Sequence, residues 1–248
     1  MQVHIALALV AGTFIGSVLG FIGAGGAMLS VPILIYGFGF NPKSATVAAL
    51  LIVFSAALSG AYPKYRRGKV LVKDAFVIWA LALTTNIGGA LLARHLSDRA
   101  ITIGFAFILI AAATSMLKGP VSNGNEKKIP LIVLIAISLI IGAMTGIFGV
   151  GGGFLAIPIL VLFFNISLEK ASGTSLLIIS LNCLTALMTH HREWKVIDWQ
   201  VPIYMAISAV LVSTIASHQS SRVPPQILRK AFSALLYVIA IYTLIKSR

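Results

Sequence analysis

Two glycine-rich runs are the residues of this sequence best suited to chemistry. They read FIGAGGAMLSVP over residues 21–32 and IFGVGGGFLAIP over residues 147–158. Glycine permits positive φ and close backbone approach, so a helix can end and restart at such a run. A restarted helix offers unpaired N–H groups and the positive end of its dipole, which favour an anion. The candidate binding residues are Gly23, Gly25, Gly26, Gly149, Gly151, Gly152 and Gly153.

The alternative role of glycine here is close helix packing, as is common in membrane proteins. Gly12, Gly16 and Gly20 in the first half, and Gly142 and Gly146 in the second, are spaced by four and fit that packing role. The two runs hold more glycine than packing requires, and we assign a structural role to the proline that ends each run, Pro32 and Pro158. We therefore favour broken helices that line a binding site.

Neutral polar residues within the apolar segments extend the candidate site. They are Thr174 and Ser175 in ASGTSLLI and, farther along the same segment, Asn182. Hydroxyl and amide groups can bind an oxyanion without a buried countercharge. The alternative for each hydroxyl is a bond to a carbonyl of its own helix.

No charged side chain falls inside an expected membrane segment, because the six carboxylates and every Lys and Arg lie in loops or at segment ends. Intramembrane acids usually mark cation pumps and proton relays, so their absence disfavours a cation transporter. No nucleophile elbow, P-loop, HExxH motif or paired carboxylate occurs. We therefore expect no enzyme activity, no metal site and no cofactor.

Composition points to a lipid bilayer as the main solvent. Hydrophobic residues make up 58% and charged residues 10% of the 248, with a mean hydropathy of +1.00, against about 25% charged in soluble domains. The net charge of +13 comes from short loops between apolar segments, which argues against a nucleic-acid partner. Basic loops usually lie in the cytoplasm, so we place loops 63–74 and 118–129 there.

Ten apolar segments form two matching sets. The first set covers residues 5–22, 27–40, 44–62, 75–93 and 99–117, and the second covers residues 130–148, 154–165, 171–189, 201–217 and 227–245. The second segment of each set forms only about 20 Å of helix, short of the roughly 30 Å hydrocarbon layer. We therefore interpret residues 5–40 and 130–165 as broken helices or re-entrant hairpins with the glycine runs at their tips.

The two sets arise from an internal repeat, because residues 142–160 repeat residues 16–34 without a gap. We predict an all-α polytopic membrane protein of two homologous units, each with about four membrane helices plus a broken element. The first membrane repeat spans residues 1–117, a linker spans 118–129, and the second repeat spans 130–248. An odd number of crossings in each half would make the repeats inverted, and a single crossing of each broken element would make them parallel.

The duplicated pattern G-x-x-x-G-x-x-G-x-G-G-x-x-x-x-x-P, at Gly16–Pro32 and Gly142–Pro158 and followed in the second copy by KASGTSL, resembles the sulfite exporter TauE/SafE family, of the 4-toluene sulfonate uptake permease type. The resemblance covers nearly the whole chain. It implies a multi-pass transporter of the plasma membrane of a bacterium or archaeon, with sulfite, sulfonates or related organic anions as substrates. In the first half, Ala27 stands where Gly153 stands in the second, and Ala48 and Ala49 stand in place of the Thr-Ser pair.

We therefore expect a secondary transporter of a small anion, most simply sulfite, a sulfonate or another sulfur-containing organic anion. It would work by alternating access around the two glycine-rich breaks. The alternatives are a cation-coupled carrier of another small solute, an anion channel, and a membrane protein whose glycines only pack helices. A coupling proton or Na⁺ and a homodimer are compatible with the sequence.

Overall fold

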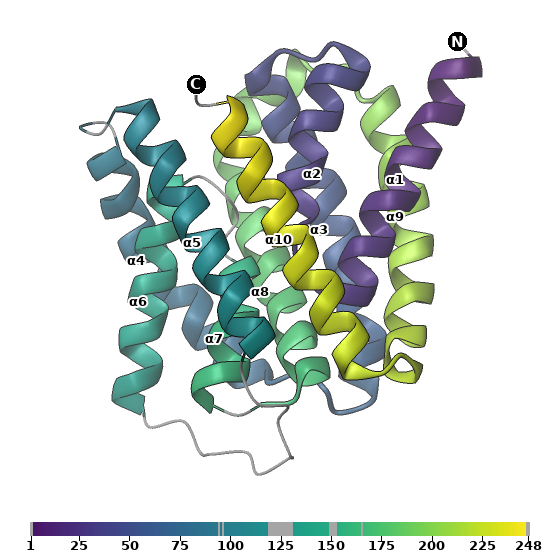
Figure 1. The fold of residues 1–248 in the computed structure, drawn as a ribbon. Coiled ribbons are helices and arrows are strands. Elements are labelled where there is room, and N and C mark those ends of the chain that lie inside the picture. The colour runs from purple at the N-terminus through teal and green to yellow at the C-terminus, as the bar shows by residue number, and fades with distance from the viewer. Residues whose placement is uncertain are drawn as a thin grey trace. The chain divides into compact units, whose positions relative to one another are not determined.

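The computed structural model describes residues 2–93, 95, 97–118, 131–148, 153–164 and 166–246, and within these residues it contains helices and no strand (Figure 1). The helices follow the expected apolar segments closely, so the all-α prediction is confirmed. They are α1 (Gln2–Ile22), α2 (Gly26–Pro32), the π-helical turn η1 (Ile33–Gly37), α3 (Pro42–Arg66), α4 (Val72–Ala93), α5 (Asp98–Lys118), α6 (Leu131–Phe148), α7 (Gly153–Phe164), α8 (Leu168–Thr189), the 3₁₀ turn η2 (His191–Lys195), α9 (Gln200–Gln219), the 3₁₀ turn η3 (Ser220–Arg222) and α10 (Pro225–Lys246).

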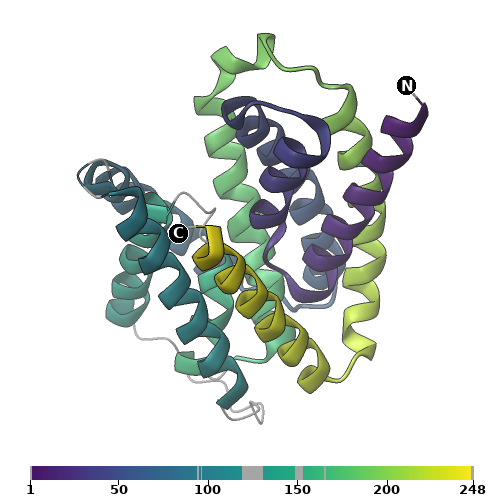
Figure 2. The ribbon, with the colours of Figure 1, turned by 45° about the horizontal axis from the view of Figure 1, so that its top comes forward.

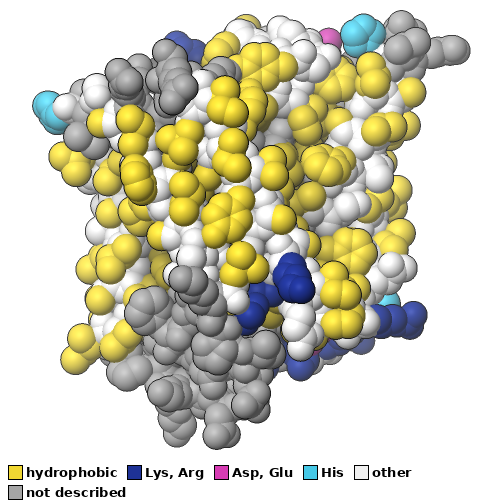
Figure 3. Space-filling model, in the orientation of Figure 1, with side chains coloured by type: hydrophobic (Ala, Val, Ile, Leu, Met, Phe, Trp, Pro, Cys, Tyr) yellow, Lys and Arg dark blue, Asp and Glu magenta, His cyan; other side chains and the backbone are white. Residues whose placement is uncertain are grey.

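The helices have the length and the apolar surface of membrane spans. Among the described residues, five helical stretches are long and apolar enough to cross a bilayer: His4–Ile22, Pro42–Arg66, Leu168–Thr189, Gln200–Arg222 and Pro225–Ile245. Large apolar side chains point outward, as at Val10, 67% exposed, and Ile132, 81% exposed. Hydrophobic side chains cover much of the described face in Figure 3. The protein is a polytopic membrane protein.

The helices form two compact units, and each unit combines both halves of the sequence. Unit 1 consists of residues 1–71 and 172–222, and unit 2 of residues 72–171 and 223–248. Unit 1 therefore holds α1 to α3 together with most of α8, and α9. Unit 2 holds α4 to α7 and α10. Residues 118–129 thus divide the two repeats in the sequence, but each compact unit contains helices from both repeats.

Unit 1 is held together by close contact of α1 with α9, which lie side by side (Figures 1 and 2). A Cβ atom on Gly16 would come within 2.5 Å of the Ala209 carbonyl oxygen, and one on Gly20 within 2.5 Å of the Ser213 carbonyl oxygen. The absence of a side chain at these glycines lets the two backbones touch. The packing role expected for the first-half glycines spaced by four is confirmed.

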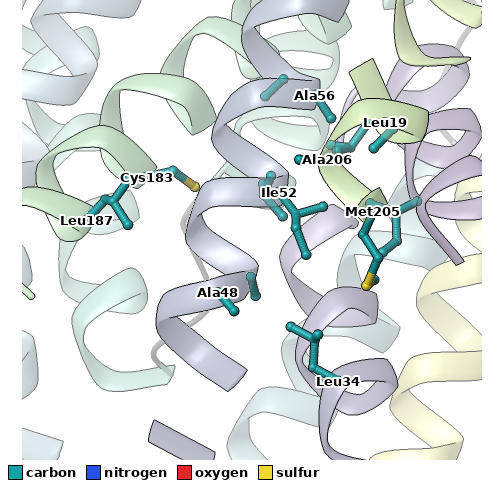
Figure 4. Packing of buried hydrophobic residues seen from close by; sticks show 14 of the residues in the cluster. Leu19, Leu34, Ala48, Ile52, Ala56, Cys183, Leu187, Met205 and Ala206 are labelled. Atoms are coloured by element: carbon teal, nitrogen blue, oxygen red, sulfur yellow. The ribbon is translucent and has the colours of Figure 1, made fainter. Parts of the chain in front are cut away.

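Helix α9 also contacts α3, through two serine side chains that hydrogen-bond to carbonyl oxygens of α3. The Ser213 hydroxyl donates to the Ala56 carbonyl oxygen at 2.8 Å, and the Ser217 hydroxyl donates to the Gly60 carbonyl oxygen at 2.5 Å. Both partners advance by one helical turn, so α3 and α9 run parallel. The core of unit 1 fills the space around α3 with small side chains such as Ala48, and with larger ones from α1, α8 and α9 (Figure 4).

Unit 2 repeats the glycine contact with other helices. A Cβ atom on Gly142 of α6 would come within 2.6 Å of the Ala82 Cα in α4. Gly142 corresponds to Gly16 in the duplication, so corresponding glycines pack against an alanine in each unit.

Polar contacts join α5 and α10 in unit 2. Thr114 Oγ1 lies 2.6 Å from the Tyr237 hydroxyl, and Arg229 donates to the Leu117 carbonyl oxygen at 3.1 Å. These pairs make α5 and α10 antiparallel.

The loop expected at residues 63–74 is shorter than predicted. Helix α3 continues to Arg66 and α4 begins at Val72, so the connection comprises only residues 67–71. Gly68, at φ 68°, donates to the Tyr65 carbonyl oxygen at 2.9 Å, and the Lys69 amide donates to the Lys64 carbonyl oxygen at 2.9 Å. This is the Schellman arrangement that ends a helix. In the predicted linker, Lys118 ends α5 and residues 119–130 lie outside the described residues.

We expect the neighbouring glycines of α4 to respond oppositely to alanine. A Cβ atom on Gly89 would collide with the Ala143 carbonyl oxygen and lie 3.2 Å from its Cα, whereas one on Gly88 meets nothing within 4 Å. Gly89→Ala should therefore destabilise the protein by about 1–3 kcal/mol. Gly88→Ala should be neutral or stabilising by up to about 1 kcal/mol, because alanine favours a helix.

Thermal unfolding of the two detergent-solubilised variants beside the wild type would measure this difference. Equal midpoints for Gly88→Ala and Gly89→Ala would contradict the close α4–α6 contact.

Candidate functional site

The first glycine run breaks the chain where the sequence predicts. Helix α1 ends at Ile22, and α2 begins at Gly26. Between them Gly23 has φ 87° and Gly25 has φ 90°, a region that side chains other than glycine rarely adopt. The Gly23 amide closes α1 by donating to the Leu19 carbonyl oxygen at 2.7 Å. The expected break in the first half is confirmed, and all four residues 23–26 are buried.

The proline that follows the break lies at a change of helix type. Pro32 is the last residue of α2, and the π-helical turn η1 begins at the next residue. A proline has no amide hydrogen, so the helix loses one internal bond at this point. Pro158 lies inside α7 and is buried.

The second glycine run falls mostly outside the described part of the chain. Helix α6 ends at Phe148 and α7 begins at Gly153. Gly149, Gly151 and Gly152 are outside the described residues, so their assignment as binding residues stays a prediction.

The first break packs against the beginning of α8. A Cβ atom on Gly23 would collide with the Ser172 hydroxyl oxygen and come within 2.8 Å of the Ser172 Cβ. Ser172 itself is only 2% exposed. Glycine at position 23 is therefore required twice, once by its positive φ and once by the serine that occupies the space.

Lys64 reaches the same place from α3. Its ammonium group donates to the Ser172 hydroxyl oxygen at 2.6 Å, and the residue is 1% exposed. Lys64 lies in the last turns of α3, where the negative end of the helix dipole favours a cation. Lys64, Ser172 and Gly23 are far apart in the sequence, but Ser172 contacts both of the others.

Lys64 lies in the last turn of α3, in agreement with the prediction that every Lys falls in a loop or at a segment end, but its burial was not predicted from the sequence. The expected apolar segment ends at residue 62 and the expected loop begins at residue 63, whereas α3 continues to Arg66. Basic residues in the last turn and a glycine just beyond are the usual signs of a helix C-terminus. Arg66 and Gly68 are those signs here, and they would have placed Lys64 inside α3.

The two residues after Ser172 fix α8 to the end of α3 and to the connection that follows it. A Cβ atom on Gly173 would collide with the Lys69 carbonyl oxygen and lie 3.2 Å from the Lys64 Cβ. Thr174 Oγ1 accepts a hydrogen bond from the Leu71 amide at 3.0 Å. Three consecutive residues of α8 therefore hold this part of unit 1 in one arrangement.

The structure brings together some of the predicted site residues. Gly23 contacts Ser172, and Thr174 and Ser175 follow on α8, both fully buried. Asn182 is half-buried on the same helix, about 10 Å beyond Ser175 along its axis. Asn182 therefore lies at a different level from the others.

Fixed charge in unit 1 is unevenly distributed. Its two carboxylates in sequence are Glu193 and Asp198, and both lie in the connection from α8 to α9. Lys64, Arg66 and Arg67 lie at the C-terminal end of α3. Among the described residues no group of three or more His, Cys, Asp or Glu side chains is placed to hold a metal ion. Basic side chains therefore gather at the C-terminal end of α3, and the acidic side chains of unit 1 lie in a different connection.

Comparison with known proteins identifies one matching family. The model of the family described as sulfite exporter TauE/SafE matches residues 8–243. A probable membrane transporter protein of Xylella fastidiosa is 24% identical over 95% of this chain and 93% of its own length. A probable membrane transporter protein of Methanocaldococcus jannaschii is 25% identical over 96% of this chain and 95% of its own length. No solved structure matches the chain.

Thr174→Val should destabilise the protein, because it leaves the Leu71 amide without the oxygen that accepts its hydrogen bond. We expect a loss of about 1–3 kcal/mol, and Thr174→Ser should retain most of the stability. Thr46→Val is the matched control, since Thr46 is exposed and bonds only the Pro42 carbonyl oxygen of its own helix in the contacts described. Thermal unfolding would measure the stability of all three variants. Equal losses of stability for Thr46→Val and Thr174→Val would contradict a stabilising role for the bond between Thr174 and the Leu71 amide.

Proposed function

The chain belongs to the sulfite exporter TauE/SafE family and is a membrane transporter, and on this premise we propose that it carries a small anion. The substrate we propose is sulfite, a sulfonate or another sulfur-containing organic anion. The observation that carries the proposal is the break at Gly23–Gly25, which is buried and packs against Ser172, the residue whose hydroxyl oxygen accepts a hydrogen bond from Lys64. Broken helices in a membrane protein persist where their freed backbone groups meet protein or a cavity.

Alternating access around the two glycine runs is the mechanism we propose. The break in unit 1 and its counterpart at residues 149–153 would each present backbone donors to the anion. If the repeats are inverted, the two halves can exchange their conformations, and the binding site then opens to one side of the membrane and afterwards to the other. In support of inversion, α5 and α10 correspond in the duplication and run antiparallel within unit 2 (Figure 1). A proton or Na⁺ gradient, or the membrane potential, would drive the transport.

The same proposal places the protein in the plasma membrane. The connection at residues 67–71 carries Arg67 and Lys69, and α3 ends with Lys64 and Arg66 just before it. Positive charge next to a span favours the cytoplasmic side. We therefore propose that this end of α3 faces the cytoplasm.

Gly23→Ala should abolish most transport, and the effect should exceed the strain that an alanine causes at any positive φ. Gly39 provides the control, since its φ is 72° and a Cβ atom there meets nothing within 4 Å. Both variants strain the backbone, and only Gly23→Ala also displaces Ser172. We expect Gly23→Ala to lower uptake of labelled sulfite into proteoliposomes roughly tenfold or more.

Gly39→Ala should keep most of the wild-type uptake. If both variants fold correctly and show equal uptake, the proposal that the break at Gly23 takes part in transport would be wrong. Ion currents far above the turnover of a carrier would identify an anion channel instead.

A further inference from the structure

A cluster of hydrogen bonds joins the C-terminal ends of α3 and α9. Arg67, the residue after the last turn of α3, donates from Nη1 to the His218 carbonyl oxygen at 3.0 Å and to the Ser221 hydroxyl oxygen at 2.7 Å. Its Nη2 lies 3.0 Å from His218 Nδ1. We propose that this cluster binds the phosphate of an anionic phospholipid at the membrane surface. The site requires only that the protein lies in a bilayer, whatever solute the protein carries.

The charge of Arg67 is not neutralised by the groups that hold it. A carbonyl oxygen, a hydroxyl group and an imidazole that accepts a hydrogen bond carry no net charge, and no carboxylate bonds to Arg67 among the described residues. The carboxylates of unit 1 lie before the start of α9, so the length of that helix, about 30 Å, separates them from His218. An arginine without an acidic partner is well suited to a phosphate.

The guanidinium group keeps donors for a ligand. Arginine has five N–H donors, and the three contacts use two hydrogens of Nη1 and one of Nη2. The two that remain, on Nε and Nη2, suffice for a bidentate contact with phosphate oxygens. A guanidinium only donates, so His218 Nδ1 accepts and its ring hydrogen is on Nε2. His218 and Ser221 therefore orient Arg67 without using its charge.

The alternative role of Arg67 is to cap α9, because the last carbonyl groups of a helix have no partner within it. The bond to the His218 carbonyl oxygen fulfils that role. It uses one hydrogen of the guanidinium and does not need the contacts to Ser221 Oγ and His218 Nδ1. Capping thus explains one contact, and the two side-chain contacts fix the guanidinium in one orientation, as a binding site requires.

The cluster lies at the end of an apolar stripe that faces lipid. Ile207, Leu211 and Ile215 recur every four residues on α9 and are 50%, 60% and 55% exposed. His218 follows Ile215 by three residues, so it lies on the same face of the helix, one turn farther along. The acyl chains of a lipid can therefore contact the stripe while its head group reaches the cluster.

Nearby side chains favour a lipid with a net negative charge. Arg66 ends α3, Arg222 ends η3, and both are exposed. Their charges attract an anionic head group and repel the cationic part of a zwitterionic one. Tyr62 and Tyr65, near the end of α3, are 61% and 57% exposed, and tyrosine is typical of the membrane surface. The partner that fits is an anionic phospholipid such as phosphatidylglycerol.

The test compares lipids of different charge on purified full-length protein in detergent. Dioleoylphosphatidylglycerol or dioleoylphosphatidylcholine would be titrated into the protein, with the midpoint of thermal unfolding as the readout. Each variant is compared with its own midpoint without lipid, so the loss of a helix cap does not count as a loss of lipid binding. Arg67→Gln removes the charge of the cluster. Arg66→Gln is the control, because it removes an equal charge from an exposed neighbour whose side chain makes no hydrogen bond among the described residues.

We expect Arg67→Gln to weaken the binding of phosphatidylglycerol about tenfold or more, because it removes charge-assisted hydrogen bonds. Arg66→Gln should change the binding by no more than about threefold, because an exposed charge is screened by salt. Equal weakening by the two variants would overturn the site, since general positive charge would then explain the binding.

A second pair of variants applies if Arg67→Gln does not fold. His218→Ala removes the acceptor that orients Nη2 of Arg67. Gln219→Ala is its control, since Gln219 is the exposed last residue of α9 and its side chain makes no hydrogen bond among the described residues. His218→Ala should weaken the binding of phosphatidylglycerol about threefold or more, and Gln219→Ala should not. Equal binding by these two variants would overturn the site.

The wild-type protein gives the remaining outcomes. Stronger stabilisation by phosphatidylglycerol than by phosphatidylcholine would support the site, and equal stabilisation by the two lipids would overturn it. Sodium phosphate at the same concentration and ionic strength separates a lipid from a soluble anion. Stabilisation by phosphate equal to that by phosphatidylglycerol would overturn the assignment to a lipid.

Discussion

The docking of α8 on the end of α3 is the contact on which the candidate site depends. Ser172 meets both Lys64 and Gly23, Gly173 lets the backbone of α8 reach Lys69, and Thr174 binds the Leu71 amide. These contacts need a hydroxyl, a residue without a side chain and a second hydroxyl in consecutive positions. They join a helix of the first half to a helix of the second, so the site exists only when both halves are present.

Small residues make the remaining contacts possible, because lipid provides no hydrophobic drive for helices to associate. In unit 1 the glycines of α1 admit the backbone of α9, and serines of α9 bond carbonyl oxygens of α3. In unit 2 Gly89 and Gly142 do the same for α4 and α6. Packing is therefore based on backbone proximity and hydrogen bonds, which leaves large apolar side chains free to face lipid.

The apolar segments could be predicted from the sequence because hydrocarbon thickness and helix rise fix their length. The break at Gly23–Gly25 could be predicted because a cluster of glycines before a proline has few other uses inside a membrane. The pairing of helices could not, since corresponding segments such as α3 and α8 have similar composition. The burial of Lys64 was missed because hydropathy ends a span at the first charges, whereas the helix continues toward the glycine that caps α3.

The mixing of the two halves within each unit has a consequence for biogenesis. The glycine face of α1 packs on α9, which begins only at Gln200. During synthesis α1 therefore enters the membrane long before its partner leaves the ribosome, and its exposed backbone must be shielded by lipid, by the insertion machinery or by a temporary neighbour. Unit 1 closes only near the end of translation, so a prematurely terminated chain would present the same glycine face to quality-control proteases.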